Sequence, residues 1–143
     1  MELKDIAWEN ARVINGLDPR KWRIDACGAR IHYDRYDAPG MMYAWQIDHI
    51  FPQSALEKAD VPQELIDDSA NIRALATRNN QSKSDNYPVY IRSYIWHDGK
   101  NVEIDENTDF ANCRTKVGPF TQEKIKELYK DYLKTFKSGD LNK

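Results

Sequence analysis

Two strand-like segments followed at once by a short helix constrain the fold of this chain most strongly. Residues 42–50 alternate in side-chain character, which predicts a strand, and residues 71–76 predict a second one. Pro52 lacks an amide hydrogen for strand pairing, so the first strand should end nearby. Thr77 follows the second strand directly, and its hydroxyl can cap a helix that runs to about Ser84. The connection over residues 51–70 is polar, with a short helix expected at residues 62–67.

Two hairpins and two flanking helices are predicted around this unit. Residues 22–25 and 29–36 predict one hairpin, and residues 89–96 and 101–104 predict another with Asp98-Gly99 at its turn. Apolar spacing predicts a helix over residues 4–15 and a C-terminal helix with Thr121 as its cap. The stripe of the C-terminal helix, interpreted as core packing, consists of Ile125, Leu128, Tyr129, Tyr132, Leu133 and Phe136. We therefore expect a single α+β domain over residues 1–143.

Composition restricts the class of protein. With 41% hydrophobic and 31% charged residues, the chain has the composition of a folded globular domain. No apolar run is long enough to span a membrane, and the acidic N-terminus has no apolar segment typical of a signal peptide. We therefore expect a cytoplasmic protein without membrane partners. Cys27 and Cys113 cannot form a four-ligand zinc site on their own and are expected to be reduced thiols.

The charge distribution bears on nucleic-acid binding. The net charge of −2 argues mildly against it, because phosphate contacts usually come from a basic surface. However, residues 12–35 hold six basic and three acidic residues, residues 71–92 hold four basic and one acidic residue, and acids concentrate in residues 57–68. A basic face on a nearly neutral protein is therefore compatible with the sequence.

Five polar residues form the candidate site: Asp48, His49, Asn71, Asn80 and Lys83. A histidine titrates near neutral pH and suits a general base, whereas carboxylate and amide oxygens are ligands that Mg²⁺ prefers. Taken singly, each residue also fits an ordinary role in a turn, a helix start or a solvated surface. Neighbours on a strand point to opposite faces, so Asp48 and His49 can share a site only where the strand ends or bends. The hypothesis therefore depends on the order and spacing of the five.

Three segments together resemble the HNH endonuclease motif. They are Trp45-Gln46-Ile47-Asp48-His49-Ile50-Phe51-Pro52, Asn71-Ile72-Arg73-Ala74-Leu75 and Asn80-Gln81-Ser82-Lys83-Ser84-Asp85. The pattern is similar to HNH proteins with a Trp-x-Ile-Asp-His-Ile-x-Pro signature and to the HNH domain of CRISPR RNA-guided nucleases. The resemblance covers about residues 43–86, with a weaker likeness over residues 22–31, and residues 87–143 match no family pattern.

The resemblance implies a ββα-metal core, extended here by an extra hairpin and flanking N- and C-terminal helices. It implies that Asp48 and Asn80 are ligands of Mg²⁺ or Mn²⁺, that His49 is the general base, and that Asn71 holds the loop that orients the imidazole. The nine-residue spacing from Asn71 favours Asn80 over Asn79. Lys83, at i+3 from Asn80, is expected to contact a substrate phosphate. The implied substrate is DNA, with RNA left open.

The sequence also departs from many family members. The cysteine pairs of zinc-containing HNH proteins are absent, and the acids of residues 54–68 leave the approach of a nucleic acid in doubt. His32 and His97 match no motif position and are interpreted as structural or surface residues. Two alternatives stay open: a binding module that does not cleave nucleic acid, and a toxin or phage nuclease with an immunity partner.

Overall fold

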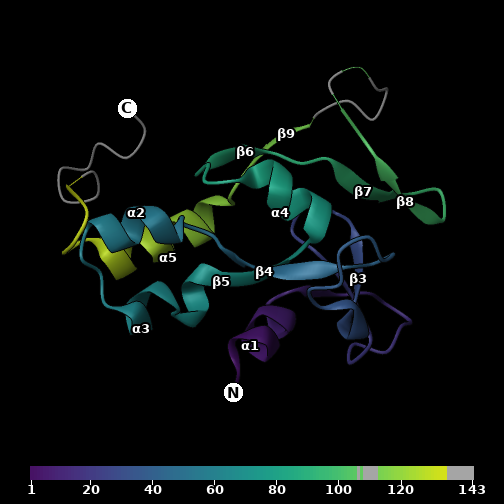
Figure 1. Ribbon diagram of the computed structural model, residues 1–143, viewed down its shortest axis with the longest axis horizontal. Coiled ribbons are helices and arrows are strands. Elements are labelled where there is room, and N and C mark those ends of the chain that lie inside the picture. Colours follow the sequence, from purple (N-terminus) through teal and green to yellow (C-terminus); the bar gives the residue numbers. More distant parts are fainter. Residues whose placement is uncertain (106, 108–112, 135–143) are drawn as a thin grey trace.

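The centre of the structure is an antiparallel strand pair followed by a helix. The computed structural model describes residues 1–105, 107 and 113–134. β4 (Trp45–His49) pairs with β5 (Ile72–Ala76), and α4 (Thr77–Lys83) begins directly after β5 and packs on both strands (Figure 1). The predicted strand–strand–helix order and the α+β class are confirmed. The capping role of Thr77 is wrong, because Ala76 is the N-cap and the buried Thr77 hydroxyl has no hydrogen-bond partner among the described residues.

The N-terminal helix is shorter than predicted. α1 (Leu3–Glu9) ends at Asn10, and the chain turns into β1 (Arg12–Val13) instead of continuing as a helix. β1 pairs with β2 (Trp22–Ile24), which pairs in turn with β3 (Arg30–His32), so the predicted hairpin forms the larger part of a three-stranded sheet. Its second strand is shorter than predicted, because the chain turns into the 3₁₀ helix η1 (Tyr33–Arg35) directly after β3. The Asn10 side chain donates hydrogen bonds to the carbonyl oxygens of Ser69, three residues before β5, and of Ile72, the first residue of β5, which fixes the end of α1 against the start of that strand. Contacts far along the chain therefore override the local helical pattern.

The polar connection between β4 and β5 is more helical than expected. It contains α2 (Gln53–Lys58), which was not predicted, then α3 (Gln63–Ile66), which confirms the short helix near residues 62–67, and the 3₁₀ turn η2 (Ser69–Asn71). Pro52 and Pro62 stand immediately before α2 and α3, as expected for residues that lack an amide hydrogen.

The second predicted hairpin is only partly correct. β7 (Tyr94–His97) pairs with β8 (Lys100–Glu103), and Asp98 and Gly99 both have positive φ, 53° and 86°, as in tight hairpin turns. The preceding residues instead form β6 (Val89–Ile91), which pairs with β9 (Arg114–Lys116). A pairing partner so far along the chain leaves no local signal.

The C-terminal helix confirms the apolar stripe and corrects its start. α5 (Pro119–Tyr129) has Gly118 at its N-cap, so Thr121 lies inside the helix and the capping prediction is wrong. Ile125 and Tyr129 are fully buried, and Leu128, Tyr132 and Leu133 pack against the same core, whereas Phe136 lies outside the described residues.

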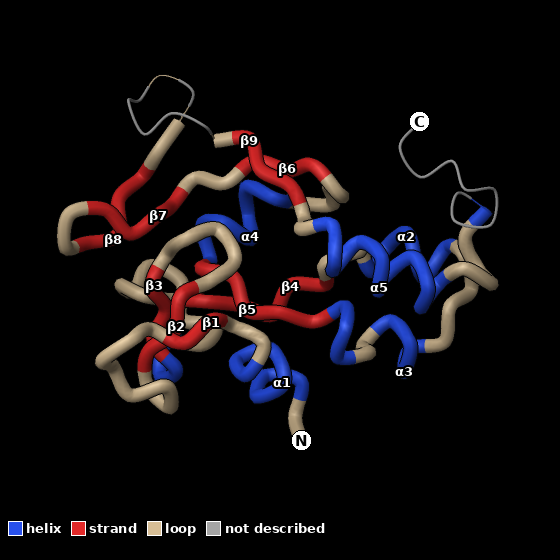
Figure 2. The backbone as a smooth tube through the Cα atoms, turned by 180° about the vertical axis from the view of Figure 1, so that it is seen from behind, coloured by secondary structure: helices blue, strands red, loops and turns tan. Residues whose placement is uncertain are grey.

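Two apolar cores meet along β5. Trp8, Ile31, Trp45 and Ile72 belong to the core beneath α1 and the three-stranded sheet, and Leu75 belongs to the core formed with α2, α3 and α5. Figure 2 shows β4 and β5 running from the β1–β3 sheet towards these three helices. None of the described helices combines the length and apolar character needed to cross a bilayer.

A buried carboxylate ties the three-stranded sheet to the β5–α4 junction. Asp25 follows β2, and its Oδ1 accepts hydrogen bonds from the amides of Cys27 (2.9 Å) and Ala29 (2.8 Å). Its Oδ2 accepts from the amide of Ala76 (2.9 Å) and from Nδ2 of Asn79 (3.0 Å). Burial raises the pKa of Asp25, and these four donors counteract that effect. The carboxylate thus fixes where α4 begins.

We predict that Asp25→Asn destabilises the fold although the two side chains have the same shape. The amide NH₂ would face N–H groups that now donate to Oδ1 or Oδ2, leaving buried donors without acceptors. The expected loss in the free energy of unfolding is about 2–4 kcal/mol. Urea denaturation measures it, with Asp98→Asn as the control, because that exposed turn residue has a conformation that Asn also tolerates. Equal stability of the two variants would contradict the role of Asp25.

Candidate active site

A pocket of about 280 Å³ lies between the end of β4 and α4. Asp48 and His49, the last two residues of β4, line this pocket together with Asn80 of α4. Ser84 and Asp85, just after α4, lie at the same pocket. The structure thus brings three of the five predicted residues together, and β4 ends at His49 as a shared site of adjacent residues requires.

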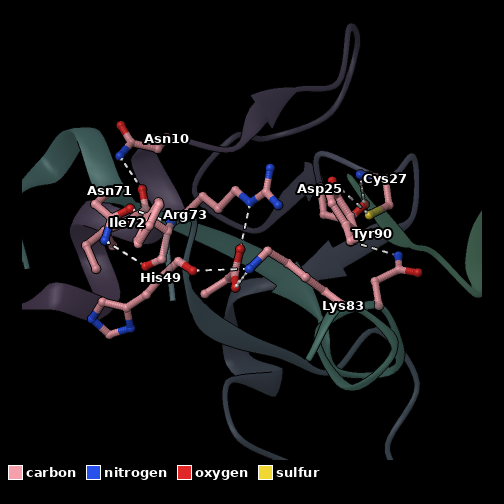
Figure 3. A network of polar contacts seen from close by, with 12 residues as sticks. Asn10, Asp25, Cys27, His49, Asn71, Ile72, Arg73, Lys83 and Tyr90 are labelled. Carbon is pink, nitrogen blue, oxygen red and sulfur yellow. Dashed lines mark hydrogen bonds and ion pairs between the residues drawn. The ribbon is translucent and has the colours of Figure 1, made fainter. Parts of the chain in front are cut away.

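Asp48 is buried between two cations. Its Oδ2 accepts a hydrogen bond from Nε of Arg73 (2.9 Å), the residue directly opposite in the strand register, and its Oδ1 lies 3.2 Å from Nζ of Lys83. Lys83 also donates to the carbonyl oxygen of His49 (3.2 Å), as Figure 3 shows. Two contacts on two different oxygens hold the Asp48 carboxylate in one orientation. Arg73 was not singled out from the sequence, although it lies inside the second motif segment.

Lys83 does not occupy the position expected for a phosphate contact. Its side chain is only 1% exposed, and its ammonium group is directed to Asp48 and the His49 carbonyl rather than to solvent. Burial lowers the pKa of Lys83, while the Asp48 charge opposes that shift. We therefore replace the predicted phosphate contact with an internal role, in which Lys83 joins α4 to the end of β4.

His49 is oriented by a carboxylate from the helical connection. Its Nε2 lies 2.8 Å from Oδ1 of Asp67, and Oδ2 of Asp67 accepts a hydrogen bond from Nε2 of Gln63 (3.0 Å). The imidazole points away from the Lys83 ammonium group (Figure 3). When Nε2 carries the proton and donates to Asp67, Nδ1 retains its lone pair, and Nδ1 makes no hydrogen bond within the described part of the chain. The sequence contains no spacing signal that would have identified Asp67.

Asn71 lies beneath the segment that follows His49 and does not line the pocket. Its side chain is fully buried, accepts a hydrogen bond from the Phe51 amide (2.7 Å) and donates to the carbonyl oxygens of Phe51 (3.2 Å) and Ile66 (3.1 Å). The Asn71 carbonyl also accepts from the amide of Ile50 (2.8 Å). These are the contacts that a residue holding the loop after His49 requires.

The structure separates the roles of the neighbouring asparagines. Asn79 is fully buried: its Nδ2 donates to Asp25 and to the Tyr94 carbonyl, and its Oδ1 accepts from the amides of Ser93 and Tyr94. Asn80 is partly exposed, donates to Oε1 of Gln46 (3.0 Å) and lines the pocket with Asp48. Asn80 therefore faces the candidate site, and Asn79 connects α4 to β7.

The donor set at the pocket suits a hard divalent cation with few protein ligands. Asp48, Asn80 and Asp85 supply oxygen atoms, which Mg²⁺ and Mn²⁺ prefer, and Mg²⁺ is usually held by one or two protein groups. No group of three or more His, Cys, Asp or Glu side chains suited to a metal occurs among the described residues. Arg73 and Lys83 oppose a further cation beside Asp48, while Asp85 favours one. The residues thus fit a sparse magnesium site better than a zinc site.

Comparison of the chain with protein-family models, with curated proteins and with solved structures found no match.

We predict that Asn79→Ala destabilises the fold much more than the adjacent variant Asn80→Ala does. Asn79→Ala removes four hydrogen bonds of a fully buried side chain and should lower the free energy of unfolding by about 2–4 kcal/mol. Asn80→Ala removes one partly exposed hydrogen bond and should cost less than about 1 kcal/mol. Chemical denaturation of both proteins measures the difference, and a larger loss for Asn80→Ala would overturn the assignment.

Proposed function

We propose that this chain is a Mg²⁺-dependent endonuclease of the HNH type that hydrolyses phosphodiester bonds in DNA. The observation that carries the proposal is the shared pocket of Asp48, His49 and Asn80 on a strand–strand–helix unit. In this proposal β4, β5 and α4 form the ββα-metal core.

His49 is the general base of the proposed reaction. Asp67 accepts a hydrogen bond from Nε2–H and so favours the tautomer in which Nδ1 takes a proton from the attacking water. The water oxygen forms a bond to phosphorus, and the bond from phosphorus to the 3′ oxygen breaks. The leaving 3′ oxygen takes a proton from solvent water and His49 releases its proton to solvent, which yields 5′-phosphate and 3′-hydroxyl ends. Asn71 keeps the backbone after His49 in place through its contacts with Phe51.

Asp48 and Asn80 would hold the magnesium ion, with Asp85 adding negative charge at the same pocket. When bound, the ion supplies positive charge near the scissile phosphate and the leaving oxygen. Arg73 and Lys83 orient the Asp48 carboxylate, whose oxygens keep lone pairs beyond those used by the two cations.

A binding module that does not cleave nucleic acid is the second candidate. This candidate is favoured because Arg73 and Lys83 already neutralise Asp48 and so oppose a further cation beside it. Calorimetry with Mg²⁺ alone separates the candidates: saturable binding that Asp48→Asn weakens supports the nuclease, and absence of binding supports the module.

We predict that His49→Ala abolishes metal-dependent cleavage. Loss of a general base typically reduces the rate by about 10²–10⁴-fold. The measurement is nicking of supercoiled plasmid with Mg²⁺, with Mn²⁺ and with EDTA. His32→Ala is the matched control, because His32 lies on β3 and does not line the pocket. Full activity of His49→Ala, or no cleavage of plasmid, single strands or RNA by the wild-type protein, would contradict the proposal.

Asp67→Asn should slow cleavage without weakening substrate binding. The substitution replaces the charged acceptor of His49, so we expect kcat to fall roughly tenfold to a hundredfold, part of the effect of losing the base, with little change in KM. In the His49→Ala background the same substitution should have no further effect, since Asp67 acts only through the imidazole. Asp60→Asn, an exposed substitution in the same connection, is the control. Additive losses in the double variant would show that Asp67 acts independently of His49.

A further inference from the structure

A second, larger pocket is lined by basic groups and lies outside the proposed reaction. It has a volume of about 570 Å³ and is bounded by β5, β9 and the start of α5. Arg73, Lys116 and Lys124 line it, and no acidic residue is among the described residues of its wall. On a chain with net charge −2, this pocket thus has a locally positive wall.

Arg73 forms the inner part of this basic pocket and is incompletely satisfied. Its side chain is 11% exposed, and its Nε donates a hydrogen bond to Asp48 (Figure 3). Its Nη2 is buried and has no hydrogen-bond partner among the described residues. The guanidinium carbon lies 5.3 Å from the centre of the Tyr90 ring, but a ring face does not replace a hydrogen-bond acceptor for a buried donor. Because Asp48 is shared by Arg73 and Lys83, the described residues leave a net positive charge next to the inner end of the pocket.

The outer part of the pocket adds further groups that favour an anion. Neither Lys116, at the end of β9, nor Lys124 forms an ion pair with a described residue, and both are exposed. Thr121 lies one turn before Lys124 on the same face of α5 and lines the pocket with its hydroxyl side chain. Gly118, the N-cap of α5, also lines it, so the positive end of an eleven-residue helix adds to the lysine charges.

We propose that this pocket binds a phosphate group. Lysine ammonium groups, a planar guanidinium, a hydroxyl and a helix start are groups that bind phosphate oxygens in proteins. The phosphate can belong to a nucleic-acid backbone or to a free phosphate compound, because both present the same anionic oxygens. The inference does not depend on cleavage: Lys116, Lys124 and Thr121 have no part in the proposed reaction, and Arg73 joins the two pockets through Asp48.

In the first experiment, isothermal titration calorimetry measures the binding of inorganic phosphate to the full chain, in EDTA and at constant ionic strength. Wild-type protein should bind saturably, and the double variant Lys116→Gln/Lys124→Gln should bind at least about tenfold more weakly, because two charge-assisted contacts are lost. Lys21→Gln/Lys100→Gln makes the same change in net charge at exposed positions outside the pocket and should bind as the wild type does. Equal weakening in the two double variants, or no saturable binding by the wild type, would overturn the pocket as a site for free phosphate.

The second experiment identifies the source of the phosphate with a fluorescent DNA duplex, again in EDTA so that no cleavage occurs. If the pocket takes a backbone phosphate, Lys116→Gln/Lys124→Gln weakens duplex binding. The negative slope of log K against log salt then becomes less steep by about one, whereas the control variant keeps the wild-type slope. If it takes a free phosphate compound, only the inorganic phosphate titration responds. The proposal fails if neither titration distinguishes the pocket variant from the control. Because metal is absent throughout, failure here is distinct from failure of the nuclease proposal.

Discussion

The buried carboxylate of Asp25 is the interaction on which the arrangement of the site depends. Removing a carboxylate from water costs several kcal/mol unless donors surround it, and here the donors come from the loop after β2, the last residue of β5 and α4. Asn79 extends the network to β7. One residue further along α4, Asn80 reaches the pocket of Asp48. The direction in which Asn80 points therefore follows from the hydrogen bonds of Asn79.

Asp48 illustrates how a buried charge can position a site rather than stabilise the fold. A buried ion pair gains little net free energy over apolar packing, because desolvation offsets the attraction. Its effect is geometric: Arg73 from β5 and Lys83 from α4 fix the two carboxylate oxygens, and so each element of the central unit contributes one charge. Because Arg73 also lines the basic pocket, the same guanidinium is shared by the candidate active site and the proposed phosphate site.

The acidic connection between β4 and β5 has a different role from the one its charge suggests. From the sequence, its acids are expected to repel a nucleic acid. In the structure, Asp67 at the end of α3 instead accepts a hydrogen bond from the imidazole of His49. Asn71, at the end of η2, fixes the backbone on the other side of His49 through Phe51. The helical connection thus contacts the imidazole through Asp67 and holds the backbone after His49 through Asn71, and one of its acids is used within the protein.

The sequence by itself determined the features that short-range physics decides. Alternating side chains predict β4, the Asp98-Gly99 pair predicts the β7–β8 turn, and the apolar repeat predicts α5. The motif spacing also indicated Asn80 rather than Asn79. Only the tertiary structure decided the early end of α1, the pairing of β6 with β9, the inward position of Lys83 and the roles of Asp25 and Asp67. Each of these depends on a partner distant in the chain, and local periodicity contains no information about which distant groups will meet in the folded core.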